Sequence, residues 1–206
     1  MNFDDVHQHL EGGGIIAYPT ETVWGIGVLF DNERALESLI ELKGREVSKG
    51  VSLLVSDFYM ANEIAQIDSE EVKRFLQIVW PGPLTAVLPA KDFVSPVIHG
   101  GTGYVGLRLS SHPLVSRLMG VLQKPLTTTS ANKSGEDPAL SEDDLYWLPE
   151  QVRVVSEIGE GAGGQKPSTV VRIDGAGVEI LRAGAIGEEE LTRLAHICGL
   201  HLVESK

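Results

Sequence analysis

Short apolar runs alternate with amphipathic segments along most of this chain. From Asn32 onward, apolar residues recur at helical spacing between Ala35 and Ile40, and Asp31 or Asn32 is a suitable N-cap. Short runs rich in aliphatic and β-branched residues, bounded by Gly, Pro or polar residues, predict strands instead. The predicted strands lie at 15–18, 51–55, 84–88, 104–109, 126–129, 152–155, 169–173 and 178–181.

The helical periodicity recurs between these strands. It predicts helices near 4–10, 59–66, 70–79, 112–122 and 187–197, with a short helix near Asp143. Interleaved helices and strands favour an α/β fold with a mixed sheet. The tight turn at 174–177 joins its two flanking strands as an antiparallel hairpin. Because we find no repeat and no linker, we expect residues 1–206 to form one domain.

Composition narrows the classes of function. The chain has 42% hydrophobic residues and a net charge of −12, which argues against a protein that grips nucleic acid backbones tightly. No apolar run reaches the roughly 18 residues of a membrane span, and the first residues do not resemble a signal peptide, so we expect a cytoplasmic protein. Cys198 is the only cysteine, and we interpret it as a packing residue.

Lysines and arginines are few in this chain, and three of them cluster in the sequence. Lys43 and Arg45 flank Gly44 at the end of a predicted helix, with Lys49 nearby. Two residues that are two apart converge on one ligand only if the helix has ended, and Gly44 provides a left-handed cap. The cations are then either surface charges favoured by the helix dipole or the wall of an anion pocket. Lys49 favours the pocket.

A second polar group follows a predicted strand. Ser130 and Asn132 flank Ala131 directly after the strand near 126–129. A hydroxyl and an amide at this spacing hold a phosphate oxygen or a base edge when the chain is extended. The same residues also close turns by bonding to nearby backbone, and both interpretations stay open.

A glycine-rich segment imitates a nucleotide-binding motif. Residues 159–164 contain G-x-G-x-x-G, but a strand rather than a helix follows, which excludes a Rossmann fingerprint. Lys166 stands one position away from the P-loop lysine. A mobile loop over a pocket is the remaining interpretation. No Ser-His-Asp arrangement and no metal-ligand spacing stand out in the sequence.

Eight short blocks occur in the order found in the YrdC family, which this chain therefore resembles over nearly its whole length. Its length is similar to that of the short bacterial form, TsaC. The blocks are Tyr18–Gly25, Leu42–Arg45, Lys49–Leu53, Trp80–Thr85, Val105–Arg108, Thr129–Gly135, Pro167–Val171 and Leu181–Ile186.

The resemblance implies a fold and an activity. The family fold is a twisted mixed α/β sheet flanked by helices, with a large, positively charged concave cavity. The implied enzyme is a nucleotidyltransferase, L-threonylcarbamoyladenylate synthase. It converts L-threonine, bicarbonate or CO2, and ATP into threonylcarbamoyl-AMP and pyrophosphate. The product serves threonylcarbamoyladenosine modification of tRNA.

The resemblance also assigns roles to residues of this sequence. It implies that ATP is bound by Lys43, Arg45, Lys49, Ser130, Asn132 and Arg182, of which Lys43, Arg45, Ser130 and Asn132 are expected to be catalytic. Threonine is expected to contact Thr20, Thr22, Arg108 and Ser168. Mg2+ is expected through phosphate oxygens and water, without a protein metal site. The implied partners are a TsaD-type tRNA-modifying machinery and, weakly, tRNA; no membrane is expected.

Two departures from the family pattern keep alternatives open. Trp24 stands where Tyr or Phe is usual, and Glu46 places an acid where Pro is common. These changes leave room for a diverged paralogue of the YciO type. A double-stranded RNA or tRNA binding module is a second alternative. Carbamoyl transfer, as in hydrogenase maturation proteins, is a third.

Overall fold

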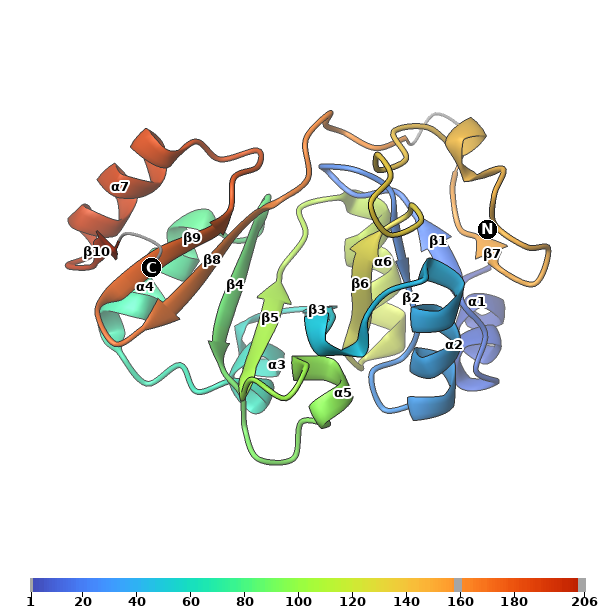
Figure 1. Cartoon of the computed structure of the whole chain (residues 1–206), viewed down its shortest axis with the longest axis horizontal. Coiled ribbons are helices and arrows are strands. Elements are labelled where there is room, and N and C mark those ends of the chain that lie inside the picture. Colours follow the sequence, from blue (N-terminus) through green and yellow to red (C-terminus); the bar gives the residue numbers. More distant parts are fainter. Residues whose placement is uncertain (1, 158–160, 204–206) are drawn as a thin grey trace.

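Ten strands of the described residues form one mixed sheet that runs through the middle of the molecule (Figure 1). The computed structural model describes residues 2–157 and 161–203. The strand order is β10-β9-β8-β4-β5-β3-β6-β2-β1-β7. The strands are β1 Ile16–Tyr18, β2 Gly25–Gly27, β3 Ser52–Leu54, β4 Leu84–Pro89, β5 Tyr104–Arg108, β6 Leu126–Ser130, β7 Arg153–Val154, β8 Thr169–Asp174, β9 Gly177–Arg182 and β10 His201–Val203.

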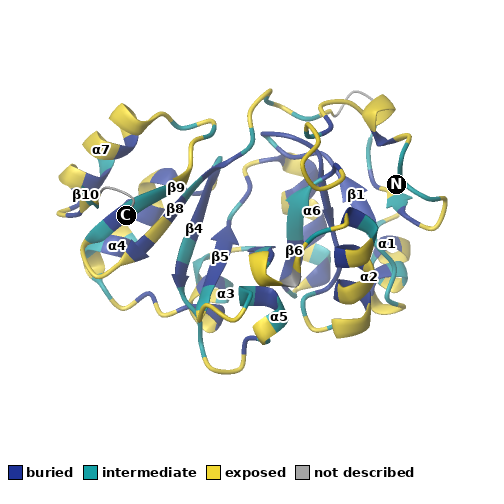
Figure 2. Cartoon of the chain, viewed as in Figure 1, coloured by how far each residue is buried: buried dark blue, intermediate teal, exposed yellow. Residues whose placement is uncertain are grey.

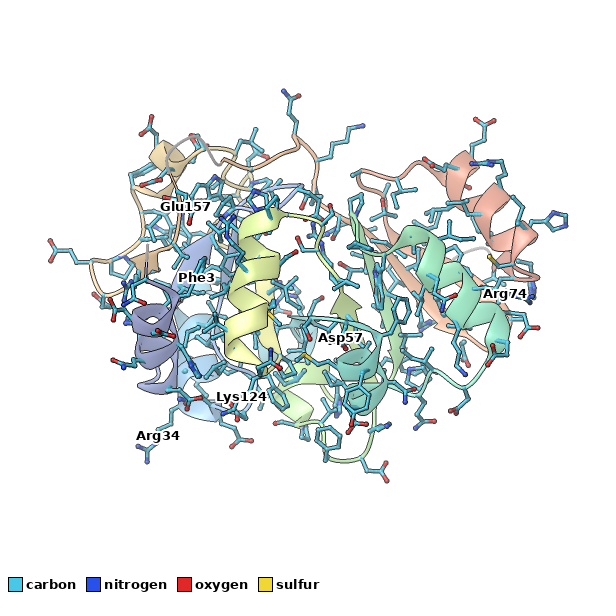
Figure 3. The ribbon with its side chains drawn as sticks, turned by 180° about the vertical axis from the view of Figure 1, so that it is seen from behind. Phe3, Arg34, Asp57, Arg74, Lys124 and Glu157 are labelled. Carbon is cyan, nitrogen blue, oxygen red and sulfur yellow. The ribbon has the colours of Figure 1, made fainter. Side chains whose placement is uncertain are left out.

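Helices cover both faces of this sheet. The helices are α1 Phe3–Glu11, α2 Glu33–Lys43, α3 Phe58–Ile64, α4 Glu70–Val79, α5 Pro96–His99, α6 Pro113–Leu122 and α7 Glu188–Ile197, with 3-10 turns at Val47–Lys49 and Glu142–Leu145. Seen from behind, α6 and α4 lie in front of the sheet (Figure 3), whereas α2 lies on the side seen in Figure 1. The sheet is thus the middle layer of a sandwich.

The core follows the alternation of the strands. On one face, apolar residues of α1 and α6 pack against Ile16, Tyr18 and Leu126. On the other face, α2 packs against the core that contains Trp24 and Ile26. Figure 2 shows buried strands and exposed outer helix faces. Alternate strand residues point to opposite faces, so one sheet carries both clusters. The predicted α/β class with a mixed sheet is confirmed.

Pairing directions bring distant segments together. β4 pairs with β8 in parallel, β3 pairs with β5 in parallel, and β6 is antiparallel to both β2 and β3. The turn at 174–177 joins β8 and β9 as the predicted antiparallel hairpin. Strands that lie far apart in the sequence therefore end beside one another.

The predicted start and end of α2 are confirmed. Asn32 is the N-cap, and its side chain accepts a hydrogen bond from the backbone N–H of Ala35 at 3.1 Å. Gly44 is the C-cap, with a φ of 59° in the left-handed region. The helix therefore ends between Lys43 and Arg45, and the two side chains bond to different segments: Lys43 to the loop after β6, and Arg45 to carbonyls at 49–50.

Several short elements were not predicted. β2 has only three residues, two of them glycines, and β10 and α5 have three and four residues. Segments this short carry too little periodicity to be recognised, and β2 is extended because β1 and β6 pair with it on both sides. The predicted packing role of Cys198 agrees with its burial at 3% exposure. None of the helices in the described residues is long and apolar enough to cross a membrane.

Candidate functional site

A pocket of about 120 Å³ forms where residues of β2, β3, β4, β5, β6, β8 and β9 meet. Three arginines line it, namely Arg45 from the loop after α2, Arg108 from β5 and Arg182 from β9. Thr20 and Ser130 line it as well. The sheet topology thus gathers residues from all eight sequence blocks. The large concave cavity implied by the resemblance stays a prediction.

Arg45 and Arg182 are held in the pocket by neutral oxygens. Arg45 donates to the carbonyls of Gly50 and Lys49, both at 3.1 Å. Arg182 donates to the carbonyl of Ser168 at 2.8 Å and to its hydroxyl at 3.1 Å. Within residues 2–157 and 161–203, neither arginine forms an ion pair with a carboxylate. Their charges are therefore available to an anion.

The electrostatics confirm that these cations lie close together. Burial lowers the pKa of Arg182, and the charges of Arg108 and Arg45 lower it further. Burial also lowers the pKa of Arg45. Like charges in one pocket destabilise the charged forms, and an anion between them would relieve the repulsion. The pocket is thus a positive site in a chain whose net charge is −12.

Lys43 lies behind the pocket rather than in its lining. It is buried at 4% exposure, and its Nζ donates to the carbonyl of Ser130 and, at 2.7 Å, to that of Asn132. The backbone N–H of Ser134 donates to the Lys43 carbonyl at 2.9 Å. Burial and the charge of Arg45 lower the pKa of Lys43 to about 8. Lys43 therefore ties the end of α2 to the loop after β6.

Of the two interpretations, ligand binding or turn closure, the first agrees with the position of Ser130 and the second with that of Asn132. Ser130 lines the pocket. The Asn132 side chain instead donates to the carbonyls of Lys133 at 2.8 Å and Glu136 at 2.7 Å. Asn132 thus closes the turn, and its own carbonyl accepts from Lys43. The sequence pair has one residue at the pocket and one in its supporting loop.

The residues expected on the threonine side are buried and belong to two hydrogen-bonded groups. The hydroxyls of Thr20 and Thr22 lie 2.9 Å apart, and Arg108 Nη2 donates to Thr22 Oγ1 at 2.8 Å. Ser168 Oγ lies 2.9 Å from Thr85 Oγ1 and accepts from Arg182. Hydrogen bonds therefore connect the loop that follows β1 with strand β5. They also connect Ser168 with strands β4 and β9.

Sequence reasoning missed Glu21 as a site residue. Its Oε1 lies 3.0 Å from Arg108 Nη2, and the Ser110 hydroxyl donates to its Oε2. Burial acts to raise the pKa of Glu21, but the charge of Arg108 and the Ser110 hydrogen bond outweigh it and hold the pKa below its usual value. The only signal in the sequence is an acid between two threonines, which by itself predicts no partner.

Lys49 does not join the other cations. Its Nζ lies 3.6 Å from Glu46 Oε2, and both side chains are more than half exposed. Lys49 is not among the lining residues of the pocket and contributes its backbone carbonyl to Arg45. The acid at Glu46 therefore faces Lys49 instead of Arg45.

The glycine-rich segment lies partly outside the described residues, since 158–160 are not described. Gly163 donates its N–H to the Thr20 carbonyl at 2.9 Å, and Gly164 donates to the Thr22 carbonyl at 3.0 Å. The described part of the segment is thus bonded to the loop that carries the threonine-side residues.

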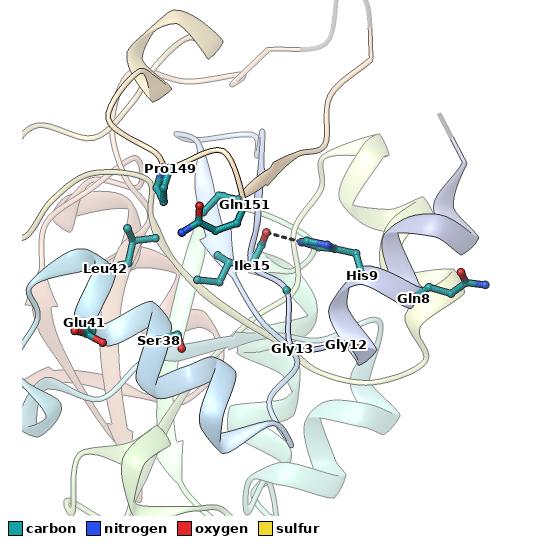
Figure 4. Close-up of a pocket in the computed structure, with 12 residues that line it drawn as sticks. Gln8, His9, Gly12, Gly13, Ile15, Ser38, Glu41, Leu42, Pro149 and Gln151 are labelled. Carbon is teal, nitrogen blue, oxygen red and sulfur yellow. Dashed lines mark hydrogen bonds between the residues drawn. The ribbon is translucent and has the colours of Figure 1, made fainter.

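A larger pocket lies elsewhere, between α1, α2 and the loop at 149–152 (Figure 4). Its volume is about 660 Å³, and none of the described residues that line it is Lys or Arg. His9 is hydrogen-bonded to the carbonyl of Ile15 at 3.1 Å (Figure 4). Gly12, Gly13 and Gly14 form much of the wall. This pocket offers space but no gathered charge.

Residues 8–184 match the sequence family Sua5/YciO/YrdC, which is described as telomere recombination. The chain belongs to this family. The resemblance read from the eight sequence blocks is therefore confirmed. The threonylcarbamoyl-AMP synthase of Vibrio campbellii is 36% identical over 189 residues, which cover 89% of this chain and 99% of the relative. The synthase of the same name from Vibrio parahaemolyticus is 36% identical over 186 residues, with the same coverage.

Solved structures share the fold. The Sua5 protein of P. abyssi, solved in complex with L-threonine, matches with a TM-score of 0.88 and 27% identity. The match covers 98% of this chain but 58% of Sua5, so this chain spans little more than half of that relative. YciO of E. coli matches with a TM-score of 0.81 at 22% identity, covers 92% of each chain, and supports the fold alone.

Proposed function

We propose that this protein is an L-threonylcarbamoyladenylate synthase, a nucleotidyltransferase that makes threonylcarbamoyl-AMP and pyrophosphate from L-threonine, bicarbonate or CO2, and ATP. The observation that carries this proposal is the convergence of Arg45, Arg108 and Arg182 on one pocket. A polyphosphate and a carboxylate are the anions that arginine binds best. The synthase names of the two Vibrio relatives support the same activity.

The polyphosphate side of the pocket is assigned to Arg45 and Arg182. Both lack a carboxylate partner among the described residues and so retain charge for the phosphates. Ser130 adds a hydroxyl at the pocket wall, while Lys43 and Asn132 hold the loop that presents it. Lys49, which is not among the lining residues, contributes positive charge near the phosphates. This division refines the set of ATP-binding residues implied by the resemblance.

The threonine side is assigned to Thr20, Thr22, Arg108 and Ser168. Arg108 binds the carboxylate of the substrate L-threonine, and the hydroxyl of Thr22 holds the guanidinium in place. The L-threonine in the P. abyssi Sua5 structure supports this substrate. Since Arg182 bonds to Ser168, the two sides of the pocket share a wall.

In the proposed reaction, the neutral amine of threonine attacks the carbon of CO2, and the amine proton is released to water. A carbamate oxygen then forms a bond to the α-phosphorus of ATP, and the bond to the β-phosphate oxygen breaks as pyrophosphate leaves. Phosphoryl chemistry of this kind depends on positioning and charge neutralisation more than on a protein nucleophile. Arg45 and Arg182 supply charge neutralisation, and Arg108 positions the amino acid.

Magnesium is proposed to enter with the nucleotide. Among residues 2–157 and 161–203, no group of three His, Cys, Asp or Glu side chains lies where it would hold a metal ion. The one carboxylate paired with Arg108, Glu21, is already bonded to Ser110. Phosphate oxygens and water are the ligands that we propose for Mg2+, whose charge would offset that of the leaving pyrophosphate.

The product is a mixed anhydride, so it is reactive and needs a rapid acceptor. We propose that a TsaD-type machinery takes it up to modify tRNA, with weak tRNA binding at most by this chain. ATP and threonine are pooled in the cytoplasm, and we place the reaction there.

Incubation with ATP, L-threonine and bicarbonate tests the proposal. We expect threonine-dependent pyrophosphate release and an adenylate of the corresponding mass in a mass spectrum. Lys43→Ala and Arg45→Ala variants should lose both. Pyrophosphate release without threonine, or full activity in both variants, would contradict the proposal. Salt-sensitive tRNA binding that ATP does not alter would favour the RNA-binding alternative, and turnover of carbamoyl phosphate would favour carbamoyl transfer.

A further inference from the structure

Glu21 is the carboxylate that the fold places against a pocket arginine. Its Oε1 lies 3.0 Å from Arg108 Nη2, and the side chains are only 15% and 7% exposed. The Ser110 hydroxyl donates to the other carboxylate oxygen. A buried charge pair of this kind is held firmly, because removing one partner leaves the other charge without compensation.

This pair fixes one side of the Arg108 guanidinium. Nη2 donates to Thr22 Oγ1 at 2.8 Å and forms an ion pair with Glu21 Oε1, whereas Arg108 Nε and Glu21 Oε1 are buried and neither has a hydrogen-bond partner among the described residues. An unpartnered buried donor costs free energy until a ligand or a rearrangement satisfies it. Arg108 is thus held by two protein groups and still has donor capacity left.

The pocket therefore has two electrostatic parts. Arg45 and Arg182 are bonded to neutral oxygens, whereas the charge of Arg108 is offset by Glu21. An uncompensated arginine attracts any phosphate, but a compensated one recognises a ligand by geometry more than by net charge. A zwitterionic amino acid has no net charge, so the compensated part suits it.

We propose that Glu21 is a positioning and specificity-determining residue: it fixes the Arg108 guanidinium and offsets its charge, so that this part of the pocket takes a zwitterionic amino acid and rejects phosphate. The inference rests on the proposed function, because L-threonine is the ligand that it concerns. Glu21 acts through Arg108 and does not itself contact the substrate.

Glu21→Gln is the test, because glutamine keeps the shape and removes the charge. We expect the Kd of L-threonine, measured by calorimetry without nucleotide, to rise about tenfold, the loss typical of one charge-assisted hydrogen bond. The KM for threonine should rise in the same way, while kcat and the KM for ATP stay within about twofold. Inorganic phosphate should become a competitive inhibitor against threonine only in this variant.

Glu179→Gln is the matched control. Glu179 pairs with Arg172 at 2.5 Å and is 13% exposed, so it resembles Glu21 in its own burial and in having an arginine partner, although Arg172 is 47% exposed. Glu179 lies outside the pocket lining. We expect this variant to keep the threonine Kd of the wild type and to resist inhibition by phosphate. Any loss that both variants share reports the general cost of breaking an ion pair.

The outcomes separate the two proposals. If the wild type binds neither threonine nor ATP, the proposed function fails. If it binds both, and Glu21→Gln keeps the wild-type threonine Kd or weakens ATP and threonine equally, the role of Glu21 is overturned. Should Glu21→Gln fail to fold, Ser110→Ala removes the second support of the carboxylate and is expected to weaken threonine binding alone.

Discussion

Of the two pockets compared, the larger one has few charged residues in its lining, and the smaller one is lined by three arginines. The pocket beside α1 and α2 holds about 660 Å³, whereas the pocket between the strands holds about 120 Å³. The larger pocket is lined by glycines and by polar groups such as His9, whose ring is hydrogen-bonded to the Ile15 carbonyl. The smaller pocket is lined by Arg45, Arg108 and Arg182.

The difference favours placing the proposed binding site where charge is gathered rather than where the volume is larger. Bringing three guanidinium groups together costs free energy through repulsion and desolvation, as the lowered pKa of Arg182 reflects. A fold retains such a cost where a ligand compensates it. The larger pocket, where Glu41 is the one Asp, Glu, Lys or Arg among the described lining residues, carries no comparable cost of repulsion. Substitutions in the two pockets are therefore expected to differ in their effects.

The largest expected effect is the loss of a pocket arginine. Arg45→Ala or Arg182→Ala should lower kcat/KM for pyrophosphate release about 100-fold or more, because each removes charge that the transition state needs. Gln151→Ala and Gln8→Ala, in the larger pocket, should stay within about twofold of the wild type. Pyrophosphate release at varied ATP measures both sets. Equal losses of kcat/KM for variants of the two pockets would contradict a special role of the arginine-lined pocket.

The next effect concerns Lys43 and pH. Its pKa is about 8 in the folded chain, against about 10.4 when unfolded, so between these values the unfolded chain binds more protons and stability rises with pH. The wild type should gain about 3 kcal/mol relative to Lys43→Met from pH 7 to pH 11. Urea unfolding at several pH values measures the difference. Parallel stability curves would show that Lys43 carries no burial penalty.

A smaller effect is expected in the glycine segment beside the charged pocket. A Cβ on Gly164 would lie 2.9 Å from the Glu21 carbonyl and 3.0 Å from that of Thr22, whereas one on Gly161 would meet nothing within 4 Å. Gly164→Ala should therefore cost about 1–3 kcal/mol of stability and raise the threonine KM, with Gly161→Ala as the matched control. Thermal unfolding and kinetics measure both variants. An unchanged Gly164→Ala would mean that this packing is loose.

The smallest effect is expected at Lys49. Its ion pair with Glu46 is exposed, and such pairs contribute little. Lys49→Ala should weaken ATP binding less than about threefold, measured by calorimetry. A loss of ATP affinity as large as that of Arg45→Ala would mean that Lys49 contacts the nucleotide and belongs to the charged pocket.

Local features were predictable because they depend on neighbouring residues. The N-cap at Asn32, the left-handed Gly44 and the hairpin turn at 174–177 follow from short-range hydrogen bonding and backbone sterics. β2 was not predictable in this way, since its pairing with β6 decides its conformation. The same holds for the site: residue types with the right chemistry were visible, but their partners were not.

The sequence by itself determined the longer elements, the family and the residue types able to bind anions, because periodicity, capping and ordered motifs depend on consecutive positions. Only the tertiary structure decided what each charge faces. Lys43 reaches carbonyls 87 residues away, Arg108 is paired with Glu21, and Lys49 turns to Glu46. Electrostatic partners depend on distance in space, which the sheet order sets and spacing along the chain does not.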